Sequence, residues 1–584
     1  MYGMVFKPRE DMSVVFSGQA GQGLQTLEAL LTRLLKRSGY HVFSYSEYMS
    51  RIRGGNNSTQ VRVSSRRVFA YTRRIDIFIP LQEGAMDRFH DRITPETVIL
   101  GERSFIDERY LDGHHPVLDV PINDMAREAG GPVYANTILL GILAGLFYAD
   151  KELMDEEIRM VLSRLGPERL QKNLAAAAAG YGQSAGLLKP GQASISMERF
   201  REVRDEILTD GINAVGLGGL AGGCTFVSSY PMSPSTGVLV FFTKKAGDAG
   251  VVVEQAEDEI SAINMVLGSW YAGGRGMVTT SGGGYALMVE ALSLAGCIES
   301  PLVIHLGQRP GPATGLPTRT EQADLLFALH SGHGEFPRAI LAPGTLEQGF
   351  SHTRHAFYLA DKYQVPVFIL TDQYFLERRY NVPDLDQGMV YDQRFIVRTN
   401  EGYRRYALTG DGISPRGIPG FGDGRVRADS DEHDQDGFIT EDSSTRKAMV
   451  DKRLKKLAGL SREALAPDLF GPQDYENLVV CWGSSLHAVQ EGLDMLGRKD
   501  TAILHFSQVY PLPPAALEHL GRAKTRIIAE SNATAQFARL VRSETGLGFD
   551  AKILTYSGMP LMPEDVCEGL QRALGRKEKT HGRL

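Results

Sequence analysis

Short apolar stretches alternate with helix-like stretches along most of the chain, and this alternation constrains the fold more than any other feature of the sequence. In the first part, MSVVFSG, YHVFSYS, TQVRVSS, IDIFIPL and ETVILG have the length and composition of strands. Residues 24–38, between the first two of them, carry apolar side chains at helical spacing. Strands that alternate with helices predict α/β domains whose sheets are mostly parallel and covered on both faces.

The same alternation restarts twice and so divides the chain. With 584 residues, the chain is too long for one hydrophobic core. We expect three α/β domains, over residues 1–190, 200–386 and 471–584. Residues 387–470 are rich in Asp, Arg and Gly, which predicts an irregular polar linker or insertion that contains a basic helix.

Charge and apolar patterning exclude several functions. The net charge of −7 argues against a nucleic-acid or an anionic-membrane partner. The longest apolar stretch, residues 138–149, is shorter than the ~20 residues that cross a bilayer, so we expect it to form a buried core helix. The N-terminus lacks the basic start and apolar core of a signal peptide, which predicts a cytoplasmic protein.

The four cysteines are too far apart in the sequence to form a local metal site. They are Cys224, Cys297, Cys481 and Cys567, and none belongs to a CxxC pair. Disulfides are not expected in a large, cysteine-poor protein of this kind. We therefore expect no four-thiolate iron–sulfur or zinc site and no metal ligands on this chain, and any cluster must lie on another chain.

One glutamate lies where a predicted helix meets an apolar layer. We expect residues 256–270 to be helical, with Glu259 at the edge of the apolar stripe. The stripe is made by Ala256, Ile260, Ile263 and Leu267. A buried carboxylate costs free energy unless it has a partner, so Glu259 is a candidate functional acid. The alternative is an acid at a helix start that the helix dipole favours.

Two loops that follow or join predicted strands present ligand-binding groups. Residues 230–236 (YPMSPST) hold hydroxyl groups on a backbone stiffened by two prolines, although composition alone equally fits a surface turn. Arg309 directly follows the strand PLVIHLG, where open α/β sheets place ligands, and its planar guanidinium suits a carboxylate. Arg319 is either a second cation for a ligand or one partner of a surface salt bridge.

A glycine-rich turn lies near the N-terminus. Gly18, Gly21 and Gly23 separate a predicted strand from a predicted helix, as in phosphate-binding turns. The alternative is a packing turn combined with an oligomer contact.

Together these motifs resemble those of 2-oxoacid:ferredoxin oxidoreductases. Glu259, Ala262 and Gly268 reproduce the glutamate–xx–alanine–xxxxx–glycine pattern of pyrimidine-binding domains in thiamine diphosphate enzymes. YPMSPST resembles the family motif YPITPSS, with Met232 in place of isoleucine and Ser233 in place of threonine. GQAGQG and RIRGG resemble the gamma domain of the same family, which is thought to lie over CoA.

The resemblance implies a role for each of these residues. Glu259 is the implied catalytic residue, because the matching glutamate faces N1′ of the aminopyrimidine and activates the cofactor. The implied thiamine diphosphate-binding residues are Glu259, Pro231, Ser281 and Gly282. The implied 2-oxoacid-binding residues are Tyr230, Ser233, Arg309, Thr318 and Arg319. The implied CoA-binding residues are Gly18, Gly21, Gln22, Gly23 and Arg53.

The diphosphate half of a thiamine diphosphate site is expected on another chain. In the resembled enzymes that half is an apolar strand that ends in GDG, followed by an asparagine, and both bind magnesium. Neither Gly410-Asp411-Gly412 nor Gly422-Asp423-Gly424 follows a buried strand or has the asparagine, so we interpret both as turns. The resemblance therefore implies a beta subunit that carries the diphosphate site, Mg²⁺ and a 4Fe–4S cluster.

The order of a gamma-like domain, a pyrimidine-binding domain and a transketolase-C-like domain resembles the fused alpha subunit of 2-oxoglutarate:ferredoxin oxidoreductases. The implied reversible reaction converts 2-oxoglutarate, CoA and oxidised ferredoxin to succinyl-CoA, carbon dioxide and reduced ferredoxin, as in the reductive TCA cycle. The implied assembly is an α2β2 heterotetramer that uses ferredoxin. Three alternatives stay open: pyruvate or branched-chain 2-oxoacids as substrate, a non-redox thiamine diphosphate enzyme, and a non-catalytic scaffold.

Overall fold

The computed structural model describes residues 9–49, 55–187, 197–385 and 393–575. These residues form two compact units. The first contains Met1–Thr209 and Glu377–Asp384, and the second contains Asp210–Leu376 and Leu385–Leu584. The domain borders expected at residues 190 and 386 fall outside the described residues. The four expected domain ranges stay a prediction.

The first unit is built on an eight-stranded mixed sheet, with the order β6-β5-β4-β1-β3-β2-β14-β7. Its strands are β1 (Asp11–Gln19), β2 (His41–Glu47), β3 (Asn56–Ser64), β4 (Ile77–Pro80), β5 (Val98–Gly101), β6 (Val117–Asp119), β7 (Ile207–Asp210) and β14 (Arg379–Val382). β1, β4, β5 and β6 are parallel, whereas β3 is antiparallel to both β1 and β2. The expectation of a mostly parallel sheet is wrong here, because β3 begins only nine positions after the end of β2, too short a connection for a parallel crossover.

Helices cover one face of this sheet. They include α1 (Leu24–Arg37), α2 (Ile122–Glu128), α3 (Ala135–Leu146), α4 (Lys151–Leu162) and α5 (Pro167–Leu187). Val14 and Phe16 of β1 belong to the core beneath these helices, whereas Val15 points to the opposite face and packs with Phe78 and Phe89. The short 3₁₀ helices of this unit are Arg103–Phe105, Glu108–Tyr110, Pro132–Tyr134, Ser163–Leu165 and Glu202–Asp205.

The apolar residues near position 140 form α3, which is almost entirely buried, as the sequence predicts. Within the described residues, no single helix is long and apolar enough to cross a bilayer. Two helical segments, Ile122–Glu128 and Pro132–Leu146, are together long and apolar enough, but the chain bends by 117° between them.

The second unit contains a seven-stranded sheet with the order β18-β12-β13-β11-β10-β8-β9. Its strands are β8 (Phe226–Ser229), β9 (Val252–Gln255), β10 (Gly276–Thr280), β11 (Leu302–Gln308), β12 (Ala339–Leu341), β13 (Pro366–Asp372) and β18 (Gln508–Tyr510). All neighbours are parallel except β18, which is antiparallel to β12. The helices are α6 (Gly211–Ala221), α7 (Thr236–Ala249), α8 (Glu259–Tyr271), α9 (Gly282–Cys297), α10 (Leu325–His330), α11 (Leu346–Tyr363) and α12 (Gln373–Glu377).

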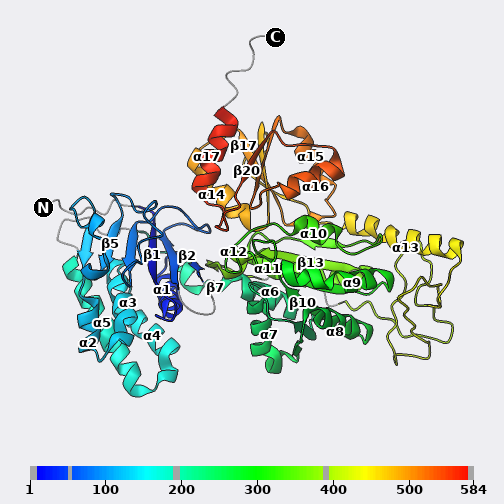
Figure 1. Cartoon of the computed structure of the whole chain (residues 1–584), viewed down its shortest axis with the longest axis horizontal. Helices are drawn as coiled ribbons and strands as arrows, with labels where there is room; N and C mark the ends of the chain where they lie inside the picture. The colour runs from blue at the N-terminus through cyan, green and yellow to red at the C-terminus, as the bar shows by residue number, and fades with distance from the viewer. Residues whose placement is uncertain (1–8, 50–54, 188–196, 386–392, 576–584) are drawn as a thin grey trace, which may run out of the picture. The chain divides into compact units, whose positions relative to one another are not determined.

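The C-terminal part of the same unit forms a five-stranded sheet with the order β15-β17-β16-β19-β20. Its strands are β15 (Asp468–Phe470), β16 (Asn477–Trp482), β17 (Thr501–Phe506), β19 (Thr525–Glu530) and β20 (Ala551–Leu554). After the 3₁₀ helix Gly483–Ser485 come α14 (Leu486–Leu496), α15 (Ala515–Arg522), α16 (Gln536–Thr545) and α17 (Pro563–Leu574). α14 and α17 lie on one side of the sheet, and α15 and α16 lie on the other (Figure 1). The predicted α/β fold is confirmed for this part.

The polar segment before this sheet is irregular but firmly attached. Residues 393–442 contain only isolated bridges, and α13 (Ser443–Arg462) follows them. Arg416 reaches the fully buried Asp361 on α11, and Lys452 of α13 donates to the buried Glu299 over 2.6 Å. Although burial alone would raise the pKa of Glu299, Lys456 and Lys452 hold it well below its usual range. Buried ion pairs therefore attach this segment to the body of the second unit.

Candidate functional site

The site residues predicted in the second unit come from the carboxyl ends of neighbouring parallel strands. Tyr230 follows β8, Ser281 follows β10 and Arg309 follows β11, while Glu259 lies beyond the end of β9. β9 lies on one side of β8 and β10 lies on the other, so the chain reverses its direction across the sheet at β8. Ligands of open α/β sheets bind at such a switch point, outside the carboxyl ends of the strands.

Glu259 is the first residue of α8. Asp258 caps the helix and accepts a hydrogen bond from the amide of Ser261 at 2.8 Å, so the helix begins later than the sequence predicts. The side chain of Glu259 is buried, at 4% exposure, and its Oε1 has no hydrogen-bond partner within the part of the chain that the structure describes.

The predicted apolar stripe of α8 is partly wrong. Ile260 is 48% exposed, and Glu259 lies on the buried face rather than at its edge. The residues that face the interior are Glu259, Ala262, Ile263, Val266, Leu267 and Trp270. Trp270 fixes this rotation of the helix, because it is fully buried and its indole N–H donates to the carbonyl of Gly276 at 2.9 Å. Both stripes are apolar, so spacing alone could not choose between them.

A turn of three glycines begins α9 and lies between two carboxyl groups. A Cβ atom on Gly284 would lie 2.5 Å from Oε1 of Glu259, and one on Gly282 would lie 2.6 Å from Oδ2 of Asp324. Only glycine leaves room for both carboxyl groups at this turn. Ser281 occupies the N-cap position, yet its buried hydroxyl makes no capping bond and has no partner among the described residues. The amide of Gly284 faces the sulfur of Met232 at 3.2 Å.

The structure brings Arg309 and Ser233 together. Nη1 of Arg309 donates to the backbone carbonyl of Ser233 at 2.7 Å, which fixes the guanidinium beside the 230–236 loop. Burial lowers the pKa of Arg309, and the charge of Asp324 opposes this shift. The hydroxyl of Ser233 makes no hydrogen bond within the described residues. Tyr230 is 41% exposed on the same loop, and Pro231 is half-buried.

Thr318 and Arg319 lie in the long loop after β11, which is fastened to the C-terminal sheet. Gln322 donates to the carbonyl of Trp482 at 2.9 Å, and the amide of Thr320 donates to Gly558. Thr318 is buried, whereas Nη1 of Arg319 lies 3.6 Å from the sulfur of Met559. The structure thus places Arg319 against the C-terminal part of the unit.

Asp324 is a candidate functional residue that sequence reasoning missed. It lies within TEQADL, at the end of the loop after β11, and a single loop carboxylate carries no periodic signal. Burial raises the pKa of Asp324 to about 7, with a further contribution from Glu321 and opposition from Arg309. Only the folded structure brings Asp324 to the glycine turn of α9.

The glycine-rich turn near the N-terminus has the predicted local structure. β1 ends at Gln19 and α1 begins at Leu24, and Gly21 and Gly23 have φ angles of 93° and 77°. Oε1 of Gln22 accepts a hydrogen bond from the amide of Gln19 at 2.8 Å and occupies the space where a side chain on Gly18 would lie. Arg53 lies outside the described residues. A CoA-binding role for this turn stays a prediction.

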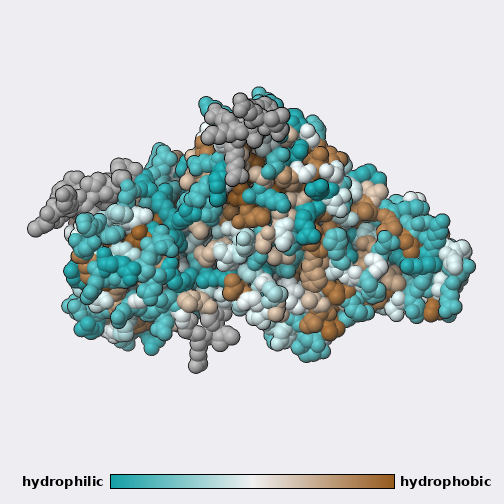
Figure 2. Space-filling model, turned by 45° about the horizontal axis from the view of Figure 1, so that its top comes forward, coloured by the Kyte–Doolittle hydropathy of each residue, from teal (hydrophilic) through white to brown (hydrophobic). Residues whose placement is uncertain are grey.

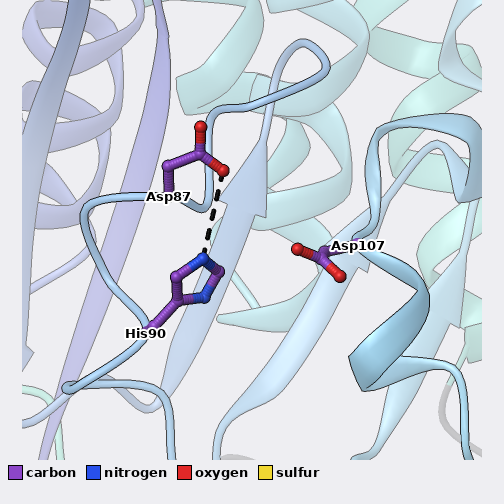
Figure 3. A group of neighbouring side chains, drawn as sticks. All are labelled: Asp87, His90 and Asp107. Carbon is purple, nitrogen blue, oxygen red and sulfur yellow. Dashed lines mark ion pairs between the residues drawn. The ribbon is translucent and has the colours of Figure 1, made fainter.

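The first unit also holds three side chains with the composition of a metal site (Figure 3). The ligand atoms of Asp87, His90 and Asp107 lie within 4.8 Å of one another. These groups already have protein partners: Nδ1 of His90 is 2.8 Å from the hydroxyl of Tyr110, and Asp107 forms an ion pair with Arg109 at 3.0 Å. Nothing beyond proximity indicates a metal at this place.

Known proteins match the chain over nearly its whole length. Residues 218–452 match a family described as pyruvate flavodoxin/ferredoxin oxidoreductase, thiamine diphosphate-binding, and residues 13–183 match pyruvate ferredoxin/flavodoxin oxidoreductase. A 2-oxoacid:ferredoxin oxidoreductase subunit alpha from a Sulfolobus species is 30% identical over 97% of this chain and 98% of its own. The 2-oxoglutarate oxidoreductase subunit KorA of Mycobacterium tuberculosis is 28% identical over 97% of this chain and 92% of its own.

A solved structure shares the fold. The 2-oxoglutarate:ferredoxin oxidoreductase from Magnetococcus marinus, with 2-oxoglutarate, coenzyme A and succinyl-CoA bound, has a TM-score of 0.91 and 28% identity. The match covers 97% of this chain and 100% of that one. The chain therefore belongs to the 2-oxoacid:ferredoxin oxidoreductases, which are thiamine diphosphate-dependent, and the prediction made from its motifs is confirmed. The subunit names of the relatives imply that such a chain works with other subunits.

The residues at the switch point fit one half of thiamine diphosphate. Oε1 of Glu259 and the hydroxyl of Ser281 are buried polar atoms without a described partner, as a site for a polar ring requires. Neither GDG triplet has the preceding strand that a diphosphate site of this kind requires. Both lie in bends of the irregular segment without a preceding strand, and Oδ1 of Asp411 accepts a hydrogen bond from the amide of Ile413 within its own turn. Their interpretation as turns is confirmed.

Proposed function

We propose that the chain is the alpha subunit of a CoA-acylating 2-oxoglutarate:ferredoxin oxidoreductase. The reaction is 2-oxoglutarate plus CoA plus oxidised ferredoxin to succinyl-CoA, carbon dioxide and reduced ferredoxin, and it is reversible, as in the reductive TCA cycle. The observation that carries the proposal is the buried carboxyl of Glu259 beside the glycine turn at the switch point, whose Oε1 has no partner among the described residues. The choice of 2-oxoglutarate is supported by the matched 2-oxoglutarate:ferredoxin oxidoreductase structure and by the KorA relatives.

In this proposal Glu259 is the catalytic residue of the chain. Thiamine diphosphate, when bound, supplies the electron sink for the decarboxylation. Glu259 holds a proton at Oε1 for the ring nitrogen N1′ of the cofactor, and the first turn of α9 leaves this oxygen free to do so. We assign the remaining cofactor contacts of this chain to Ser281 and Gly282, at the start of α9, and to Pro231, in the loop after β8.

The substrate is held by groups from two loops. Arg309 binds the carboxylate next to the oxo group, because its guanidinium is fixed at the carboxyl end of β11 and has unused donors. Ser233 binds the 2-oxo oxygen through its free hydroxyl. Arg319 binds the distal carboxylate of 2-oxoglutarate, and Thr318 and Tyr230 line the remainder of the pocket.

The remaining parts of the enzyme are supplied by partners. A beta subunit holds the diphosphate, Mg²⁺ and a 4Fe–4S cluster, ferredoxin accepts the electrons, and the assembly is α2β2. The cysteines support a cluster on another chain, since burial raises the pKa of the Cys224 thiol to about 12 and Cys481 and Cys567 are also buried. We place CoA at Gly18, Gly21, Gln22, Gly23 and Arg53 of the first unit.

The surface beside the glycine turn supports the docking of a partner. Ile260 of α8 is exposed next to Glu259, and Leu287 of α9, one helical turn after Gly283, is 52% exposed. Figure 2 shows that hydrophobic residues reach the surface at several places on an otherwise largely polar face. Exposed apolar side chains around a site mark a contact surface.

The substrate is tested with the complex assembled from this chain and its beta subunit. Ferredoxin reduction is measured with CoA and, in turn, 2-oxoglutarate, pyruvate and a branched-chain 2-oxoacid. We expect the highest kcat/KM for 2-oxoglutarate, and Arg319→Leu should reduce this value much more than the value for pyruvate, which lacks a distal carboxylate. The substrate assignment is wrong if 2-oxoglutarate is the poorest of the three. Decarboxylation without ferredoxin reduction would indicate a non-redox enzyme instead.

A further inference from the structure

The backbone of Asp324 is held in place, but no hydrogen-bond donor among the described residues contacts its carboxyl group. The amide of Asp324 donates to Oε1 of Gln308 at 3.0 Å, which ties the residue to the end of β11. Asp324 also precedes α10 directly, yet its side chain does not cap that helix. Oδ2 is buried without a partner in the described parts of the chain, although the residue as a whole is partly exposed. Folded proteins leave few buried polar atoms in this condition.

Two charged groups act on this carboxyl. Arg309 lies near enough to lower its proton affinity, and Glu321 lies near enough to raise it. No ion pair joins Asp324 to Arg309 among the described residues, and Nη1 of Arg309 donates to the carbonyl of Ser233. The remaining groups that pack around this carboxyl are uncharged. The α9 side presents Gly282 and the β11 side presents the amide of Gln308, and the amide of Gln536 on α16 donates to the carbonyl of the preceding residue, Ala323.

The two carboxyl groups at the glycine turn differ in their surroundings. Glu259 approaches the turn at Gly284, whereas Asp324 approaches it at Gly282 and lies close enough to Arg309 for their charges to interact. Substrate bound to Arg309 therefore places a second negative charge near Asp324. If Asp324 is ionised, its charge repels the nearby carboxylate of the substrate, and this repulsion lowers the affinity of the enzyme for the substrate.

We propose that Asp324 sets the affinity of Arg309 for the anionic substrate, so that it is a positioning residue that acts through its own protonation state. When Asp324 is a neutral acid, it does not weaken the attraction between the guanidinium of Arg309 and the carboxylate of the 2-oxoacid. As a carboxylate, Asp324 competes with the substrate for the charge of that guanidinium. The inference rests on the proposed function, since it requires that Arg309 binds a 2-oxoacid.

The direction of the pH dependence follows from this competition. Burial raises the pKa of Asp324 to about 7, so the free enzyme holds a mixture of both forms near neutral pH. The substrate binds the neutral form more tightly, so by linkage its binding raises the pKa further and takes up protons. KM for the 2-oxoacid therefore rises with pH between about 6 and 8. The carboxylates of the substrate do not titrate in this range, because carboxylic acids ordinarily titrate near pH 4.

The test uses the assembled complex and Asp324→Asn, which has nearly the same shape and cannot ionise. For the unaltered complex we expect KM for 2-oxoglutarate to rise about fivefold or more from pH 6 to pH 8. For Asp324→Asn we expect the low KM of the unaltered enzyme at pH 6 to persist at pH 8, with kcat little changed. Glu321→Gln is the matched control, because it removes a neighbouring charge but leaves Asp324, and it should keep the rise of KM with pH.

A second measurement does not depend on the stability of the variant. Calorimetry of 2-oxoglutarate binding to the unaltered complex, near pH 7 in buffers with different heats of ionisation, should show proton uptake. The inference is overturned if binding takes up no protons, or if Asp324→Asn keeps the same rise of KM. Failure of the proposed function looks different, because the unaltered complex would then turn over none of the 2-oxoacids tested.

Discussion

Single charged residues of the second unit have roles that depend on partners far away in the sequence. Asp361 is fully buried and accepts hydrogen bonds from Arg275, 86 residues away, and from Arg416, 55 residues away. Glu259, Ser233 and Arg309 could be proposed from the sequence because each belongs to a short local motif. Asp361 and Asp324 could not, since neither lies in a periodic pattern and their partners are distant in the chain.

Removal of the charge from Asp361 tests its structural role. Asp361→Asn leaves the guanidinium groups of Arg275 and Arg416 buried without a counter-ion, and breaking a buried pair costs about 3–5 kcal/mol. We expect a loss of that order in the free energy of unfolding, measured by denaturant titration. Asp500→Asn, which breaks an exposed pair with Arg498, is the control and should cost less than about 1 kcal/mol. Equal losses in the two variants would contradict the assignment.

At the scale of helices and strands, the alternation of apolar and amphipathic stretches predicted the α/β character of all three sheets. The errors concern how an element is rotated or paired. α8 presents a different face from the one expected because Trp270 and Asp258 fix it, and β3 pairs antiparallel because a hairpin leaves it no other direction. Spacing within one segment does not contain this information, which comes from contacts between segments.

The close packing of α3 on α5 gives a prediction for these elements. A Cβ atom on Gly180 would lie well inside van der Waals contact with the carbonyl of Ile138, whereas one on Gly182, a half-turn away on the same helix, would meet nothing within 4 Å. Gly180→Ala should lower the stability of the chain by about 1–3 kcal/mol, because two helix backbones must separate. Gly182→Ala should raise it by up to about 1 kcal/mol through helix propensity.

Thermal denaturation of the two variants provides the measurement. The predicted changes have opposite signs, so no uniform effect of an added methyl group can produce both. If Gly180→Ala proves as stable as Gly182→Ala, the close approach of α3 and α5 is wrong.

At the scale of the whole molecule, the proposed function gives the chain one half of a cofactor site. The switch point of the seven-stranded sheet carries the buried carboxyl of Glu259 and the buried hydroxyl of Ser281, whereas neither GDG triplet follows a strand. The purified chain should therefore show no 2-oxoacid-dependent reduction of ferredoxin by itself, and addition of the beta subunit should restore it.

The most direct test of this account replaces Glu259 with glutamine in the assembled complex. Glu259→Gln keeps the size of the side chain but cannot hold or release the proton that the cofactor ring requires. We expect ferredoxin reduction with 2-oxoglutarate and CoA to fall by about 10²–10⁴-fold, the usual contribution of a proton-transferring group, while assembly with the beta subunit is unchanged. An intact complex that keeps full turnover with this substitution would contradict the account.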